Sequence, residues 1–273
     1  MRESRAAEMI RILHPPESLE TLEPGLLAVA YSGDAPTDYV NAGRLLGIHG
    51  EVRRRVAEIL GLGVKAIAMP FPSMLPALRA REIDLPGIGT GWHAERARIF
   101  RYTQPYQYFF FGLAHSAGQE LNEIGELIGH RITAIDGSFN NDELGKCVGL
   151  SNVKFHATLD QVVADLIHGV SEAAVYDHPN IKLALARHEL GGRFRVSTFR
   201  FDARYPLTTG RFPNHLLFHG DAVRLHAAAC LAVDLLKTSG ELSEIYRRYT
   251  FADEHLLSIV QPTDLDCDGA VVE

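Results

Sequence analysis

The chain has 273 residues, of which 46% are hydrophobic and 22% are charged, and its formal net charge is −7. This length and apolar content suffice for one large domain or two small ones. The negative charge argues against a nucleic acid or an anionic membrane as partner, because both require a basic face. No apolar run reaches the roughly 18 residues that span a bilayer.

The first half of the chain alternates strands and helices. In chain order we expect strands at residues 26–31, 64–69 and 83–88, separated by helices at residues 51–60 and 73–80. Glycines follow the first helix and end it, and Ser73 is expected to open the second. Such a β-α-β-α-β order with short connections predicts a parallel sheet flanked by helices.

A second pattern of the same kind follows. The expected strands are residues 106–113, 131–135, 153–156 and 173–176, and the expected helices are 140–147, 158–168 and 179–189. The last third adds a strand at 215–219 and helices at 222–237 and 242–249, and the Asp-rich tail 261–273 is expected to be disordered. These C-terminal helices have no sheet of their own and should therefore pack on the first unit.

The predicted fold class is α/β, with two α/β lobes, a central cleft and a two-strand hinge. Residues 1–25 would form an N-terminal extension, residues 26–110 with 210–273 the first lobe, and residues 112–205 the second lobe. A cleft between two such lobes is a favoured place for a small ligand.

The three cysteines, Cys147, Cys230 and Cys267, are far apart and odd in number. One disulfide among them stays open, but three thiols are the simpler expectation, and the 13 histidines form no H-E-x-x-H motif. We therefore expect neither a metal nor a cofactor. The first 25 residues lack the apolar segment of a signal peptide. A sequence from which a leader had been omitted would look the same.

The stretch from residue 61 to residue 106 resembles the type II periplasmic binding proteins, specifically the polar amino-acid receptors of ABC transporters, bacterial family 3. It reads LGV…FPSMLPALRAREIDLPGIGTGWHAERARIFRYTQPY. Asp84 precedes Arg96 by twelve residues, and Pro105-Tyr106 follow Arg96 by nine and ten, which are the family's spacings. Gly137-Ser138, AAVYD at 173–177 and SGELSEIYRRY at 239–249 also fit, so that the resemblance covers roughly residues 26–250.

The resemblance implies a ligand site, which we place at Tyr31, Asp34, Phe71, Gly89, Thr90, Gly91, Arg96, Ser138, Phe139 and Asp177. Arg96 would bind a carboxylate, because a guanidinium fork matches it with two hydrogen bonds; the alternative is an ordinary surface arginine. Asp177 would bind the ligand's ammonium group, and it is also a good N-cap for the helix that follows. Phe71 either packs on the ligand or belongs to the core.

Several positions depart from the family's pattern. Asp34 stands where an aromatic residue is usual, while Gly91, His93 and Phe139 replace hydroxyl residues. The family's usual ligands therefore do not transfer directly to this chain. An additional acid at Asp34 favours a cationic or amine-bearing ligand.

The function implied by the resemblance is a monomeric solute-binding protein that closes on a small amino-acid-like ligand and delivers it to an ABC permease, in the periplasm. Two alternatives stay open, namely an enzyme on the same fold, such as a dehydratase, and a cytoplasmic ligand sensor. The chain contains neither a G-x-S-x-G motif nor a Ser-His-Asp order, and we assign no catalytic residue.

Overall fold

The computed structural model describes residues 2–33, 37–87 and 90–249. The chain divides into two compact units. Unit 1 consists of Met1–Tyr108 and Pro213–Glu273, and unit 2 consists of Phe109–Phe212. The chain passes from one unit to the other in β7 (Gln107–Ser116) and in β12 (Arg211–His215), which are neighbours in one sheet.

The first part of unit 1 is a parallel strand pair with helices beside it. Strand β1 (Leu26–Tyr31) pairs with β4 (Gly63–Ala68), and the connection contains the hairpin β2 (Tyr39–Asn41) and β3 (Arg44–Leu46) and helix α2 (Ile48–Leu60). Gly61 ends α2 in the left-handed conformation, with φ of 74°, as helices commonly end.

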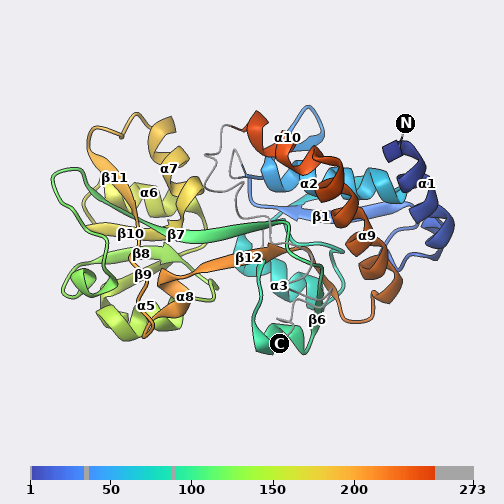
Figure 1. Ribbon diagram of the computed structural model, residues 1–273. Helices are drawn as coiled ribbons and strands as arrows, with labels where there is room; N and C mark the ends of the chain where they lie inside the picture. The colour runs from blue at the N-terminus through green and yellow to red at the C-terminus, as the bar shows by residue number, and fades with distance from the viewer. Residues whose placement is uncertain (1, 34–36, 88–89, 250–273) are drawn as a thin grey trace. The chain divides into compact units, whose positions relative to one another are not determined.

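Helices from both ends of the chain pack on α2. They are α1 (Arg2–Leu13), α9 (Val223–Ser239) and α10 (Glu241–Arg248), and they lie beside one another in Figure 1. Their shared core contains Leu27, Val29, Val52, Val56, Leu60, Leu225, Val233 and Ile245. The Arg55 guanidinium also forms an ion pair with Glu241, which ties α2 to α10. The C-terminal helices therefore cover the apolar face of α2.

The rest of unit 1 consists of short elements. They are the 3-10 helix η1 (Pro16–Ser18), α3 (Phe71–Arg79), β5 (Thr90–Gly91), α4 (Ala94–Ala97), β6 (Phe100–Tyr102) and β13 (Leu217–His219). Strand β13 pairs with β6, and β12 pairs with β5, both antiparallel. These two pairings bring segments near residues 90–102 and 214–219 together and form the frame of the candidate site.

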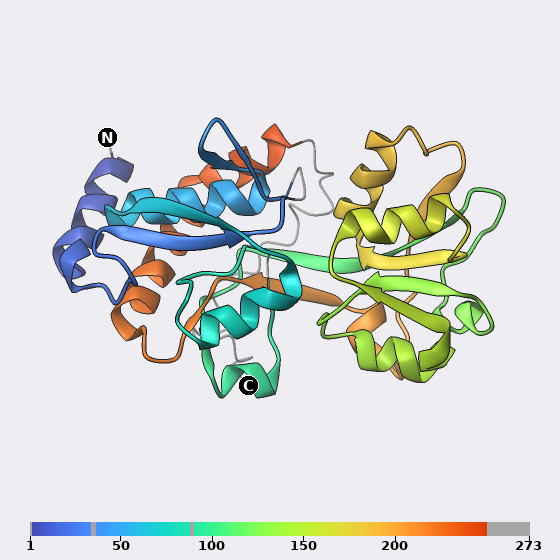
Figure 2. The same ribbon diagram turned by 180° about the vertical axis from the view of Figure 1, so that it is seen from behind.

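Unit 2 is a sheet with helices on both faces. Parallel pairs join β9 (Val153–His156) to β8 (Ile132–Ile135) and β8 to β10 (Ala173–Asp177), and antiparallel pairs join β7 to β10 and to β11 (Phe194–Thr198). The helices are α5 (Asn141–Val148), α6 (Leu159–Ile167), α7 (His178–Arg187) and α8 (Pro206–Thr209), with 3-10 turns at Ile124–Leu127 and Leu150–Asn152. Figure 2 shows α6 and α7 on one side of the strands and α5 on the other.

Three sequence-based expectations about local structure were wrong. No strand covers the described residues 83–87, because Pro86 has no N–H to donate and only an isolated bridge pairs Leu85 with Val29. Helix α3 begins at Phe71 rather than at Ser73, with Pro70 before it. The strand expected at 215–219 is two strands, because the Thr103 hydroxyl accepts the Leu216 N–H between them at 3.1 Å.

Some features of the described residues bear on chemistry. None of their helices is both long enough and apolar enough to cross a membrane. Within the described residues, Cys147 and Cys230 form no disulfide, whereas Cys267 and the tail 261–273 lie outside the described residues. No group of three or more His, Cys, Asp or Glu side chains within the described ranges is placed to hold a metal ion.

Candidate functional site

Arg96 lies on the short helix α4 of unit 1, which follows β5 directly. Its side chain is half-buried, whereas that of its neighbour Arg98 is exposed. Burial lowers the pKa of the Arg96 guanidinium, and the nearby phenol of Tyr102 opposes that shift. A guanidinium that has lost part of its water is suited to a carboxylate, because desolvation strengthens the charge-assisted hydrogen bonds.

Tyr102 links Arg96 to the backbone of strand β5. The buried Tyr102 hydroxyl lies 3.5 Å from the Gly91 carbonyl oxygen, and burial raises the pKa of this phenol to about 12. The Tyr102 ring also meets His215 edge to face, with centroids 5.4 Å apart, and His215 pairs with Thr90 across β12 and β5. The structure therefore gathers three of the ten expected residues, Thr90, Gly91 and Arg96, around one tyrosine.

Gly87 lies three positions before β5, and the backbone packed against it leaves room only for a glycine. A Cβ atom on Gly87 would lie 2.3 Å from the Ala30 carbonyl oxygen and 2.8 Å from the Tyr31 Cα. These backbone atoms at the end of β1 leave no room for a side chain. Close approach to a ligand is therefore not needed to explain Gly87. The expected site residues Gly89 and Asp34 lie outside the described residues.

Two fully buried charged side chains near this loop were missed by the sequence-based analysis. Arg53 of α2 donates from Nε to the Pro86 carbonyl and from Nη1 to the His49 carbonyl, both at 2.8 Å. Asp38 accepts the Ser32 N–H at 3.1 Å and the Ser32 hydroxyl at 2.8 Å. The signal for Arg53 was available, because positions 49, 52, 53, 56 and 60 share one face of a helix.

Arg53 adjoins a polar network inside unit 1. The Tyr106 hydroxyl lies 2.8 Å from His49 Nδ1, and the Tyr246 hydroxyl donates to the Gln107 side chain. Burial and the positive charge of Arg53 hold the pKa of His49 well below its usual value. His49 is therefore neutral at pH 7 and serves as a hydrogen-bonding group.

Asp177 occupies the end of β10 in unit 2 and caps helix α7. Its Oδ1 accepts the Asn180 N–H at 3.2 Å, so the expected capping role is present. Burial raises the pKa of this half-buried carboxyl group to about 7, and the Asn180 hydrogen bond only partly opposes the shift. Among the described residues, no lysine, arginine or histidine forms an ion pair with it.

The Gly137-Ser138 turn precedes α5 in unit 2. The Ser138 hydroxyl donates to Asn140 Oδ1 at 2.7 Å. The Phe139 ring packs against three others, Phe109, Phe111 and Phe212, with centroid distances of 5.0 to 5.5 Å. This aromatic cluster explains how unit 2 accommodates a phenylalanine where the family usually has a hydroxyl residue.

Tyr31 and Phe71 lie at the ends of elements in unit 1. Tyr31 ends β1 and is half-buried against the core that includes α2, and its carbonyl accepts the Met69 N–H at 3.0 Å. Phe71 begins α3 and packs partly against the apolar cluster around Met74 and Leu78. Core packing therefore accounts for part of both side chains.

Comparison with known proteins gives one family and many structural neighbours. The family described as bacterial extracellular solute-binding proteins, family 3, matches residues 27–252. A probable amino-acid ABC transporter periplasmic-binding protein of Sinorhizobium fredii is 26% identical over 102 residues, which are 36% of this chain. The match spans about a third, 34%, of that relative's length.

The structural neighbours share the fold at low identity. A P235GK mutant of ArgBP from T. maritima has a TM-score of 0.72 at 18% identity, covering 89% of this chain and 98% of its own. The amino-acid ABC transporter substrate-binding protein AbpA of Streptococcus pneumoniae, solved with L-arginine, also gives 0.72, at 21% identity, covering 82% and 94%. The α/β fold class and the family resemblance expected from the sequence are thus confirmed.

Proposed function

Because the chain belongs to the bacterial extracellular solute-binding proteins, family 3, we propose that it is the periplasmic receptor of an amino-acid ABC importer and acts as a monomer. The probable amino-acid receptor of Sinorhizobium fredii supports this assignment of cargo. The S. pneumoniae neighbour, solved with L-arginine, supports it further. The partner would be the importer's permease.

The proposed ligand carries both a carboxylate and an ammonium group. The observation that carries this proposal is the placement of Asp177, a half-buried carboxyl group that pairs with no cation of the described residues and whose pKa burial raises to about 7. Its Asn180 hydrogen bond does not compensate for that burial. An ammonium group of the ligand in contact with Asp177 would compensate for it, because an opposite charge within about 4–6 Å favours the ionised carboxylate. Arg96 is the proposed partner of the ligand's carboxylate.

The two proposed contacts come from different units. Arg96 belongs to unit 1 and Asp177 to unit 2. A ligand that touches both would gain its full binding energy only when both units reach it, and this differential contact is what drives closure about a hinge. The strands β7 and β12, in which the chain changes unit, are the proposed hinge.

A thermal-shift screen of the twenty amino acids tests the proposal, with arginine, lysine and histidine first because Asp34 adds an acid to the first loop. A ligand at 100 times its Kd adds about 2.7 kcal/mol of stability. We expect at least one amino acid to raise the melting temperature and its des-amino analogue to do so much less. The proposal would be contradicted if the amino acid and its des-amino analogue raised the melting temperature equally, or if no amino acid raised it. Mass spectrometry of the incubated ligand separates binding from turnover.

A further inference from the structure

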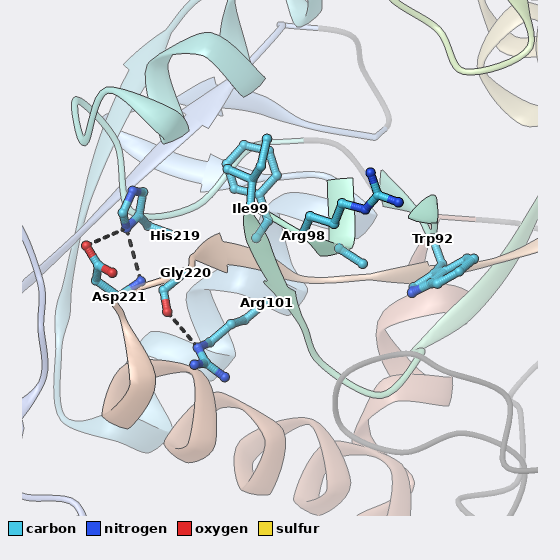
Figure 3. A pocket seen from close by; sticks show the side chains of 9 residues that line it. Trp92, Arg98, Ile99, Arg101, His219, Gly220 and Asp221 are labelled. Atoms are coloured by element: carbon cyan, nitrogen blue, oxygen red, sulfur yellow. Dashed lines mark hydrogen bonds and ion pairs between the residues drawn. The ribbon is translucent and has the colours of Figure 1, made fainter. Parts of the chain in front are cut away.

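Unit 1 has a cavity whose lining includes none of the ten residues expected to bind the amino acid. Its volume is about 650 Å³, and it lies between the α4–β6 segment and the turn that follows β13. Small-molecule sites typically measure about 300–1,000 Å³. The polar side chains in its wall are Trp92, Arg98, Arg101, His219 and Asp221 (Figure 3).

The single carboxylate in this wall already has partners. The Asp221 carboxylate lies 3.6 Å from His219 Nδ1 and 4.0 Å from the Arg81 guanidinium. The backbone N–H of Asp221 donates to the same histidine nitrogen at 3.2 Å. A nitrogen that accepts this N–H has no proton for the carboxylate, so Arg81, beside the cavity, is the cationic group that faces the Asp221 carboxylate.

The side chains of the two arginines in the wall, Arg98 and Arg101, differ in their hydrogen bonds. Arg101 Nε donates to the Gly220 carbonyl at 2.7 Å, which fixes its side chain along the wall. Arg98 is exposed, and its guanidinium forms no hydrogen bond or ion pair with any residue that the structure describes. The cavity therefore offers one uncommitted guanidinium fork in a positively charged wall, which suits an anionic group.

Apolar side chains also line this cavity. Trp92 is 38% exposed and Ile99 is 39% exposed. Figure 3 shows Trp92 and Arg98 toward one end of the cavity, and His219 with Asp221 toward the other. A flat apolar body can pack on an indole while a carboxylate attached to it meets the guanidinium. We infer that this cavity is a second binding site, which takes a small aromatic carboxylate.

Trp92 supplies a direct reporter, because it is the only tryptophan in the chain. Titration of the full-length protein with benzoate should change the tryptophan emission along a saturable curve. Benzyl alcohol, which has the same ring without the charge, should change it only linearly. Isothermal titration calorimetry with benzoate provides a second measurement that does not depend on fluorescence.

A pair of matched variants tests the role of the guanidinium. Arg98→Gln should weaken benzoate binding roughly tenfold or more, the range for a lost charge-assisted hydrogen bond. Arg44→Gln removes another exposed arginine of unit 1, which lies outside the cavity wall, and should leave benzoate affinity unchanged. Thermal melting of both variants verifies that they fold like the parent.

Three results would overturn the inference. The first is linear quenching by benzoate and benzyl alcohol alike, and the second is equal benzoate affinity in Arg98→Gln and Arg44→Gln. The third is loss of benzoate binding in Arg96→Ala but not in Arg98→Gln, which would move benzoate to the amino-acid site. Amino-acid binding is measured in a separate experiment. A negative result with benzoate would therefore overturn the cavity site without bearing on the proposed transport function.

Discussion

The guanidinium of Arg53 donates a hydrogen bond from Nε to the carbonyl oxygen of Pro86, 2.8 Å away. Arg53 is fully buried in α2, and Pro86 stands four positions before Thr90 in the chain. A buried cation thus fixes the backbone at Pro86, close in sequence to the candidate carboxylate site. The same side chain also donates to the His49 carbonyl, which sets its direction.

We predict that Arg53→Met destabilises the protein by about 2–4 kcal/mol, because it leaves the buried Pro86 carbonyl without this donor. Arg53→Lys should cost less, since an ammonium group reaches one acceptor but lacks the fork. Urea unfolding followed by circular dichroism measures both changes. Arg44→Met, at an exposed position, is the control, and an Arg53→Met midpoint equal to that of the control would refute this role.

Gly87 provides a second test of the same loop. Gly87→Ala should destabilise the protein by about 2 kcal/mol or more, because the new methyl group would lie 2.3 Å from the Ala30 carbonyl oxygen. That oxygen belongs to the buried strand β1 and cannot move away cheaply. Differential scanning calorimetry of the variant measures the loss.

The matched control for Gly87→Ala is Gly191→Ala. A Cβ atom on Gly191 would meet nothing within 4 Å, and its backbone is not in the left-handed region. Its substitution should leave stability unchanged or slightly increased. If the two variants melt at the same temperature, close packing around Gly87 does not explain that glycine.

The sequence predicted those parts of the fold that depend on local patterns. Strands β1 and β9 have the expected bounds, because each is a short segment with strong strand preference. Thr158 was expected within the helix and instead caps α6 by accepting the Gln161 N–H at 3.4 Å, a shift of one residue. Such signals lie within a few residues of the element that they define.

The parts that the sequence did not predict depend on distant partners. Arg53 is buried because the Pro86 carbonyl, 33 positions away, accepts its hydrogen bond. Helical spacing places Arg53 on the same face as Val52 and Val56, but the acceptor of its hydrogen bond cannot be read from that spacing. Likewise, Leu216 interrupts the expected strand at 215–219 because Thr103, 113 positions away, takes its N–H. The identity of such a distant partner leaves no local pattern.

For Arg96, we predict that substitution by alanine weakens amino-acid binding by about 2–5 kcal/mol, the range for truncating one partner of a desolvated ion pair. Arg96→Lys should recover only part of that loss, because lysine cannot form the bidentate contact. Isothermal titration calorimetry gives the affinities. Arg98→Gln serves as the neighbouring control and should bind the amino acid like the parent; a Kd for Arg96→Ala equal to that of the parent would exclude Arg96 from the site.

Asp177 should make stability depend on pH in the absence of ligand. Its folded-state pKa of about 7 exceeds the ordinary aspartate value of about 3.9, so the folded protein binds the extra proton between these values. The contribution of Asp177 to stability is therefore full below about pH 4 and is lost as the pH rises toward 7. Asp177→Asn should flatten this slope in urea unfolding at pH 5, 6 and 8; an unchanged slope would mean that the carboxyl group is already ionised at pH 5.

Binding of an amino acid should release a proton from Asp177. At pH 7 about half of the Asp177 carboxyl groups carry a proton if the pKa is about 7, and an ammonium group in contact would lower that pKa. Calorimetry in two buffers of different ionisation enthalpy should then show a release of up to about half a proton per ligand. The des-amino analogue should show much less release, and Asp177→Asn should bind the two ligands with more similar affinities than the parent does.

The competing interpretation is that Asp177 only caps α7. Asparagine is an equally good N-cap, so Asp177→Asn would then change neither the affinity ratio nor the compaction seen by small-angle scattering when ligand is added. Asp34→Asn distinguishes the remaining possibility. If Asp34 is the amine partner, this variant will show the selective loss of amino-acid affinity, while Asp177→Asn will not. The amine contact would then lie in unit 1 with Arg96, and closure would have to be driven by contacts of the Gly137-Ser138 turn with the carboxylate.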